Sequence, residues 1–255
     1  MAVTGIATAL ALSAGRGTGA LAVAAAFLSG QLSVGWSNDW LDAARDRAVG
    51  RSDKPTVTGL PVAVVRRAAL GAAAACVPLS LLMGAYAGVA HLLAVASAWG
   101  YNALLKRTWA SWVPYAFSFA LVPSIVVLGL PGHRFAPWWA VTAGGLLGVG
   151  AHLANALPDL DDDATTGVRG LPHRLGRTAS TAAAGLLLLV ATVLLSAGPG
   201  HVGVLGAVAL PVAAVIAATG LLLGRRPGSR APFLCVLGVA AVDVGLLVAR
   251  GGALG

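Results

Sequence analysis

Apolar runs of about 15 to 25 residues follow one another along the whole 255-residue chain, and charged residues make up only 10% of it. A run of this length with few charges is what a helix needs to cross the hydrocarbon core of a bilayer. A soluble domain carries about a quarter charged residues, so this chain has too few to cover a water-exposed surface. The sequence therefore predicts an all-α, polytopic membrane bundle that forms a single domain over residues 1–255.

Nine transmembrane helices are predicted from these runs. Their ranges are 1–15, 18–44, 61–83, 85–105, 111–130, 137–158, 178–197, 201–224 and 231–250. The breaks between them fall at glycine, proline and charged clusters, which includes the polar stretches 45–59 and 159–177.

Basic residues predict the orientation of the bundle. Fourteen of the 17 lie in or beside alternate loops, and only Arg16, Arg134 and Arg250 lie on the opposite side. The positive-inside rule then places the N-terminus in the cytoplasm and the C-terminus outside, in a plasma (inner) membrane. The net charge of +8 fits contact with an anionic lipid bilayer, and no motif for binding nucleic acid is present.

The distribution of the acidic residues is the most informative feature for locating a functional site. All nine are aspartates, and eight of them fall in two short windows. Asn38, Asp42 and Asp46 are spaced i, i+4, i+8, which places them on one face of a helix. A second row with the same spacing, from Asn155 to Asp163, suggests an internal repeat. We therefore expect two related four-helix halves, followed by a ninth helix.

Two rows of carboxylates that face each other predict a metal–diphosphate site at the cytoplasmic end of the bundle. Mg²⁺ prefers a few carboxylates together with water and phosphate oxygens. Metal ions and fixed cations would neutralise the charge that grows on an allylic diphosphate as it leaves. The basic residues expected to bind the diphosphate are Arg51, Lys54, Lys106, Arg107, Arg169 and Arg174.

These motifs resemble those of the UbiA superfamily of intramembrane prenyltransferases. The family's first motif, NDxxDxxxD, is matched in full by residues 38–46. Arg51 and Lys54-Pro55 follow it, with Lys54 in place of the arginine that is more usual in the family. The second motif, DxxxD, is matched by residues 159–163. Gly167 and Leu171-Pro172 follow that motif, as a Gly and a Leu-Pro pair do in the family. Tyr101 and Lys106-Arg107 match the family's Tyr…Lys-Arg element.

The resemblance implies an Mg²⁺-dependent enzyme that ionises a polyprenyl diphosphate and transfers the prenyl group to an acceptor. We expect a small aromatic acceptor, of the 4-hydroxybenzoate or quinone-precursor type. Asp42, Asp46, Asp159 and Asp163 are the expected catalytic residues. The expected metal ligands are Asn38, Asp39, Asp42, Asp46, Asn155, Asp159, Asp162 and Asp163.

A few residues outside the two windows are further candidates. Tyr101 and Asn102 lie near a predicted helix end, and His152 precedes Asn155 by about one turn, so these three are candidates for the acceptor site or its cavity. Asp243 is the one acid away from both windows, and an acid inside a membrane helix is a candidate functional residue.

Three other functions fit part of the pattern. A membrane terpene cyclase would share the site but let the carbocation attack its own chain. A CDP-alcohol phosphotransferase is also rich in aspartate, but Ala43 stands where its motif needs glycine. A transporter built from repeats would place its polar groups near the membrane midplane, whereas here the acids lie at helix ends.

Overall fold

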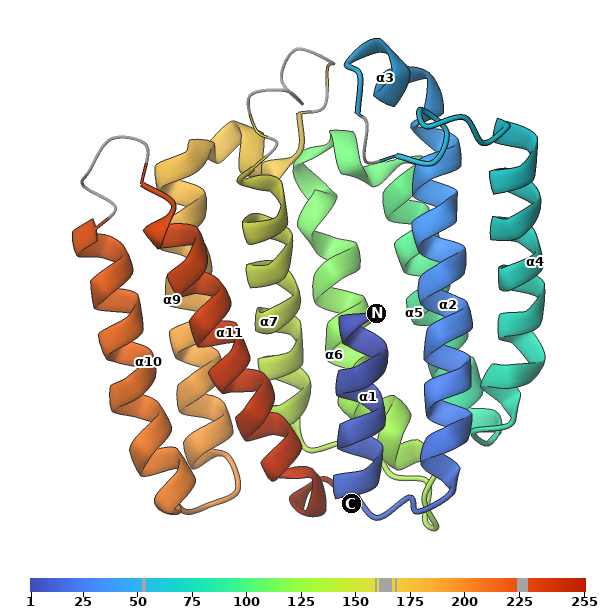
Figure 1. Cartoon of the computed structure of the whole chain (residues 1–255). Coiled ribbons are helices and arrows are strands. Elements are labelled where there is room, and N and C mark those ends of the chain that lie inside the picture. The colour runs from blue at the N-terminus through green and yellow to red at the C-terminus, as the bar shows by residue number, and fades with distance from the viewer. Residues whose placement is uncertain (52–53, 159, 161–166, 168, 224–228) are drawn as a thin grey trace.

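The computed structural model describes residues 1–51, 54–158, 160, 167, 169–223 and 229–255. These residues form helices joined by turns, and no strand occurs among them. Figure 1 shows the long helices standing side by side, with short α3 at one end of the bundle. In chain order the elements are α1 (Ala2–Ser13), α2 (Gly19–Leu41), α3 (Ala43–Ala48), α4 (Val62–Leu81), α5 (Ala85–Ala103), η1 (Leu105–Arg107), η2 (Trp109–Trp112), α6 (Val113–Leu128), α7 (Trp138–Ala156), α9 (Leu171–Ala197), α10 (Val204–Leu223), α11 (Ala231–Ala249) and η3 (Gly251–Ala253).

Each of the nine predicted helices overlaps one long helix of the structure, so the all-α prediction is confirmed. By length and composition, six segments of the described chain can span a membrane: α2, α4, η2 with α6, α9, α10 and α11. Helix α1 has 12 residues, a rise of about 18 Å, whereas the hydrocarbon core is about 30 Å thick. The prediction of nine full spans is therefore not confirmed.

Two predicted boundaries are corrected by the structure. Helix α9 begins at Leu171, not at residue 178, because Pro172 stands in its first turn, where a missing N–H costs nothing. Gly176 then interrupts the helix with a φ of 76°, so the predicted range matches only the part after this kink. Helix α2 ends at Leu41, and the stretch predicted to be a loop from residue 45 contains most of α3.

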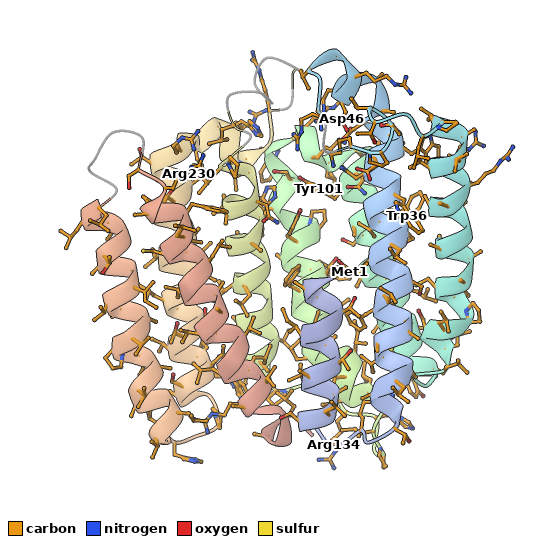
Figure 2. The ribbon with its side chains drawn as sticks, viewed as in Figure 1. Met1, Trp36, Asp46, Tyr101, Arg134 and Arg230 are labelled. Atoms are coloured by element: carbon orange, nitrogen blue, oxygen red, sulfur yellow. The ribbon has the colours of Figure 1, made fainter. Side chains whose placement is uncertain are left out.

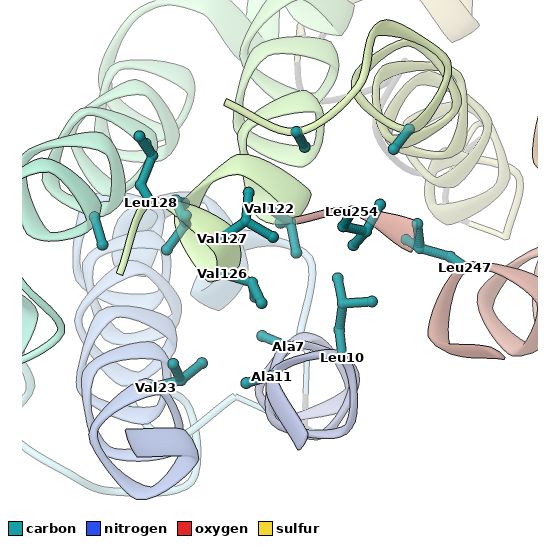
Figure 3. Close-up of a cluster of buried hydrophobic side chains, with 14 of the residues drawn as sticks. Ala7, Leu10, Ala11, Val23, Val122, Val126, Val127, Leu128, Leu247 and Leu254 are labelled. Carbon is teal, nitrogen blue, oxygen red and sulfur yellow. The ribbon is translucent and has the colours of Figure 1, made fainter. Parts of the chain in front are cut away.

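Small residues allow the helices to approach closely. A Cβ on Gly144 of α7 would stand 2.6 Å from the carbonyl oxygen of Phe119 in α6, so only glycine permits this contact. Helix α1 packs Ala7, Leu10 and Ala11 into the main hydrophobic core, beside residues of α2, α6 and α11 (Figure 3). The bundle is thus held by close helix packing on both sides of α6.

Two of the three basic residues on the predicted outer side have structural roles. The Arg16 guanidinium donates to the carbonyl oxygens of Val126 (3.1 Å) and Met83 (2.8 Å), which lie where α6 and α4 end. Arg250 donates to the carbonyl oxygen of Ser196 near the end of α9. These contacts satisfy C-terminal carbonyls that have no partner within their helices. Figure 2 places Arg134 at this end of the bundle and Asp46 at the opposite end.

Asp243 is fully buried and joins α11 to α9. One of its carboxyl oxygens accepts a hydrogen bond from the Thr192 hydroxyl at 2.6 Å, and the other has no partner among the described residues. The residue lies in the second half of α11, 12 residues after the helix begins at Ala231. We therefore assign Asp243 a packing role between two helices.

Candidate active site

The first aspartate row keeps its helical spacing across a break in the helix. Asp42 ends α2 and begins α3, with φ −94° and ψ 0°. Its N–H still bonds to the carbonyl oxygen of Asn38, and its own carbonyl accepts the N–H of Asp46, both at 2.9 Å. The row of residues 38, 42 and 46 therefore continues through the junction.

Cations from several segments pair with the aspartates of this row. The Lys106 ammonium donates to Asp42 Oδ1, and Arg45 donates to Asp42 Oδ2 at 3.0 Å and to Asp46 Oδ1 at 3.4 Å. The Lys54 ammonium lies 2.9 Å from Asp39 Oδ1. The carboxylates repel one another along the row, and these cations offset that repulsion.

Burial shifts the pKa values of two groups in this charge cluster. Asp42 is 2% exposed and Asp46 is 0% exposed. Burial raises the pKa of the Asp46 carboxyl above its usual range, although the Arg45 guanidinium acts in the opposite direction. Burial likewise lowers the pKa of Lys106, against the effect of its bond to Asp42. The second oxygen of Asp46 has no hydrogen-bond partner in the described part of the chain, so it is a ready ligand for a cation.

A described residue that follows the second aspartate row packs against Lys106, the partner of the first row. Asp159, Asp162 and Asp163 lie outside the described residues, whereas Asn155 is at the end of α7. After the row, Gly170 packs so tightly that a Cβ there would stand 2.8 Å from the Lys106 carbonyl oxygen. Lys106 therefore contacts this segment with its backbone and the first row with its side chain.

The predicted diphosphate-binding residues fall into two groups. Lys54 and Lys106 contact the first row, and Arg51 is half-buried nearby in sequence. The other three, Arg107, Arg169 and Arg174, are exposed. The sequence prediction missed Arg45, whose position three residues after Asp42 on a helix was the available signal for an ion pair.

A cavity of about 250 Å³ begins beside this charged end and runs between α1, α2, α5, α6 and α7. Tyr101, Asn102, Tyr115 and Asn155 line the end nearest the motifs, and Phe27, His91 and Ile125 line the other end. The Asn102 amide donates to the Val34 carbonyl (2.9 Å) and the Ser37 hydroxyl (2.8 Å), which fixes α5 against α2. The lining is mostly apolar, with its polar groups gathered mainly at the charged end.

An aromatic wall supports the charged end of the cavity. The rings of Tyr101 and Tyr115 meet edge to face at 5.1 Å between their centroids. His152 lies behind them, 4.8 Å from the Tyr115 ring centroid. It is not among the residues that line the cavity, and its Nε2 bonds to the Ser111 hydroxyl at 2.9 Å. The structure therefore places Tyr101 and Asn102 in the lining and His152 behind it.

A family model for the UbiA prenyltransferase family matches residues 1–240. The chain belongs to the UbiA prenyltransferase family. No curated protein matches it. The family assignment agrees with the resemblance of the two aspartate motifs.

Solved UbiA-type structures share the fold. A UbiA homologue from Aeropyrum pernix K1 has a TM-score of 0.71 at 20% identity and covers 96% of each chain. A digeranylgeranylglyceryl phosphate synthase has a TM-score of 0.70 at 18% identity, covering 99% of this chain and 93% of that one. A UbiA homologue from Archaeoglobus fulgidus, bound to GPP and Mg²⁺, has a TM-score of 0.67 at 17% identity, covering 98% and 94%.

Ser111 connects the segment after the second UbiA motif to the helix that precedes the motif. Its hydroxyl accepts the Leu171 N–H at 2.9 Å and bonds to His152 on α7. We expect Ser111→Ala to lower the free energy of unfolding by about 1–3 kcal/mol, because both buried partners lose their bond. Thermal unfolding in detergent measures this, with Thr181→Ala as the control, because among the described residues the Thr181 hydroxyl bonds only the Arg177 carbonyl oxygen within α9. An equal, small effect of both substitutions would contradict this connecting role.

Proposed function

We propose that this UbiA-family chain is an Mg²⁺-dependent prenyltransferase that ionises a prenyl diphosphate at the cytoplasmic end of the bundle. The observation that carries the proposal is the cluster of buried Asp42 and Lys106 with half-buried Arg45, which lies near the Asn102 end of a mostly apolar cavity. A charged head and a hydrophobic tail are the two parts of a prenyl diphosphate. The A. fulgidus homologue with bound GPP and Mg²⁺ supports the same substrate class.

The donor set suits a hard cation. Carboxylate and amide oxygens are available from Asn38, Asp42 and Asp46, and we propose that Asp159, Asp162 and Asp163 complete the set, with Asp39 and Asn155 at its edges. Bound Mg²⁺ supplies positive charge to the leaving diphosphate. The basic groups of Lys106, Arg45 and Lys54 bind its remaining oxygens, and we extend this role to Arg51, Arg107, Arg169 and Arg174.

The cavity then keeps the reacting carbon away from water. We propose that the prenyl chain extends from the diphosphate into the cavity, and that Tyr101 and Asn102 face the carbon where the new bond forms. Aromatic faces stabilise a nearby cation, which suits an allylic carbocation beside Tyr101 and Tyr115. We propose a small aromatic acceptor, with His152 holding the aromatic wall in place.

The membrane arrangement follows from the same proposal. We propose that residues 1–255 form one domain in the plasma membrane, in which all nine long helices lie within the bilayer as two related four-helix halves and a ninth helix. The excess of basic residues at the Asp46 end supports a cytoplasmic location for the site, a cytoplasmic N-terminus and an external C-terminus.

Product analysis tests the proposed function. Purified protein is incubated with Mg²⁺, geranyl, farnesyl or geranylgeranyl diphosphate, and a panel of aromatic acceptors, and products are identified by mass spectrometry. We expect pyrophosphate release together with a prenylated aromatic product. Formation of a cyclic hydrocarbon from the donor alone would show a terpene cyclase and contradict the transferase proposal. Absence of pyrophosphate release with every donor would contradict both the transferase and the cyclase.

A further inference from the structure

His91 is a polar side chain at the end of the cavity remote from the UbiA motifs. It lies 11 residues before Asn102 on α5, which corresponds to a rise of about 16 Å along the helix. The residue is only 3% exposed, yet it lines the cavity together with Phe27 and Ile125. The proposed reaction uses the other end of the cavity, so the reacting groups do not account for an imidazole here.

Ser80 fixes the position of the proton on this imidazole. The Ser80 hydroxyl donates its single proton to the Cys76 carbonyl oxygen at 2.6 Å. The same hydroxyl lies 2.8 Å from His91 Nδ1, so at this contact it can only accept. His91 Nδ1 therefore carries the ring proton and donates it to Ser80. Nε2 is left as an unprotonated hydrogen-bond acceptor.

The surroundings of Nε2 are apolar. The described residues provide no hydrogen bond to this atom, and the Phe27 ring lies 4.5 Å from the His91 ring centroid. Gly30 of α2 packs closely beside the imidazole, because a Cβ at residue 30 would stand 3.3 Å from Nε2 and 2.9 Å from a methyl of Val95. Nε2 is therefore a polar acceptor in an otherwise apolar part of the cavity wall.

We propose that His91 Nε2 is a recognition subsite for the hydroxyl group of an extended hydrophobic ligand that lies along the cavity. Covering an acceptor without giving it a donor is costly, so a ligand that brings an O–H to this position gains affinity over one that covers the atom with a methyl group. A single-ring acceptor bound at the reacting end is too short to reach His91. The hydroxyl therefore belongs to a long chain, either the far end of the prenyl donor or a long-chain lipid alcohol.

Binding of paired analogues tests this subsite, which rests on the proposed function because it assumes a prenyl chain in the cavity. The donor arm compares two farnesyl thiolodiphosphates, one with a terminal hydroxyl group and one with a terminal methoxy group. Both compounds resist ionisation. The alcohol arm compares farnesol with its methyl ether as competitors of plain farnesyl thiolodiphosphate. In at least one arm we expect the hydroxyl compound to bind about three- to tenfold more tightly. Dissociation constants are measured by titration calorimetry with Mg²⁺.

Two variants assign the preference to Nε2. His91→Asn keeps an N–H near Ser80 but has no acceptor at the Nε2 position, so the preference should disappear. His91→Gln places an amide oxygen there, so the preference should remain. The arm that shows the preference identifies the source of the hydroxyl, the donor tail or the lipid alcohol.

Equal affinities within both pairs in the unsubstituted protein would overturn the subsite, whether or not the variants fold. A preference that survives in His91→Asn would also overturn it. Failure of plain farnesyl thiolodiphosphate to bind in the presence of Mg²⁺ would instead contradict the proposed function. The direct binding of farnesol and its methyl ether would then still test His91.

Discussion

Asp42→Asn is expected to reduce pyrophosphate release by about a hundredfold or more while the protein stays folded. Asp42 is the most connected acid of the first row, since it pairs with both Lys106 and Arg45 and is 2% exposed. Asparagine keeps the size of the side chain and one oxygen but removes the negative charge. Loss of one preorganised charge from such a site costs about 10²- to 10³-fold in rate.

A matched control separates chemistry from folding. Asp243→Asn removes another buried aspartate, one that bonds Thr192 far from the charged end, and should leave the rate within about threefold. Steady-state pyrophosphate release with Mg²⁺ and farnesyl diphosphate measures both variants, alongside their thermal unfolding. A fully active Asp42→Asn protein, or equal losses in both variants, would contradict the role of Asp42.

Lys106→Met is expected to destabilise the metal-free protein by about 3 kcal/mol, and Mg²⁺ is expected to restore part of that loss. The substitution leaves Asp42 buried without its main cationic partner, because Lys106 itself is 7% exposed. If the row binds a divalent cation, Mg²⁺ supplies the missing charge and stabilises the folded form by mass action. Turnover should stay low, because the diphosphate loses a binding cation.

Arg107→Met is the control for this experiment, since Arg107 is the adjacent residue but is exposed. Thermal unfolding is followed with and without millimolar Mg²⁺ for both variants and the unsubstituted protein. We expect the largest Mg²⁺-dependent rise in melting temperature for Lys106→Met. A Lys106→Met protein that Mg²⁺ does not stabilise, or stabilises no more than Arg107→Met, would argue against a metal at Asp42.

Much of the fold was predictable because hydropathy reports directly on helices in a bilayer. Each predicted range overlaps a long helix, and the family suggested by the two motifs is confirmed by the family model over residues 1–240. The spacing of Asn38, Asp42 and Asp46 also survived, since backbone hydrogen bonds bridge the break at Asp42. The hydropathy of a segment and the spacing of residues along a helix depend only on neighbouring residues, so both can be read from the sequence.

Tertiary contacts were harder to predict. The pairing of Lys106 with Asp42 joins residues 64 positions apart, and the sequence offered only a general expectation that some cation would offset the row. The bond between Ser80 and His91 arises where α4 and α5 pack together, so no motif marks it. The start of α9 was missed because the polar residues of 169–177 were interpreted as a loop. In the structure, Pro172 stands in the first turn of this helix and Gly176 interrupts it.

The central claim is that both aspartate rows bind metal and diphosphate together. Diffraction from crystals grown with Mn²⁺ and farnesyl thiolodiphosphate tests it most directly, because anomalous scattering locates each Mn²⁺ ion. We expect anomalous peaks between the rows, at bonding distance from carboxylate oxygens of the first row (Asp42 or Asp46) and of the second (Asp159 or Asp163), with the diphosphate as a shared ligand. Peaks bound to one row alone, or diphosphate bound away from Lys106, would contradict the claim.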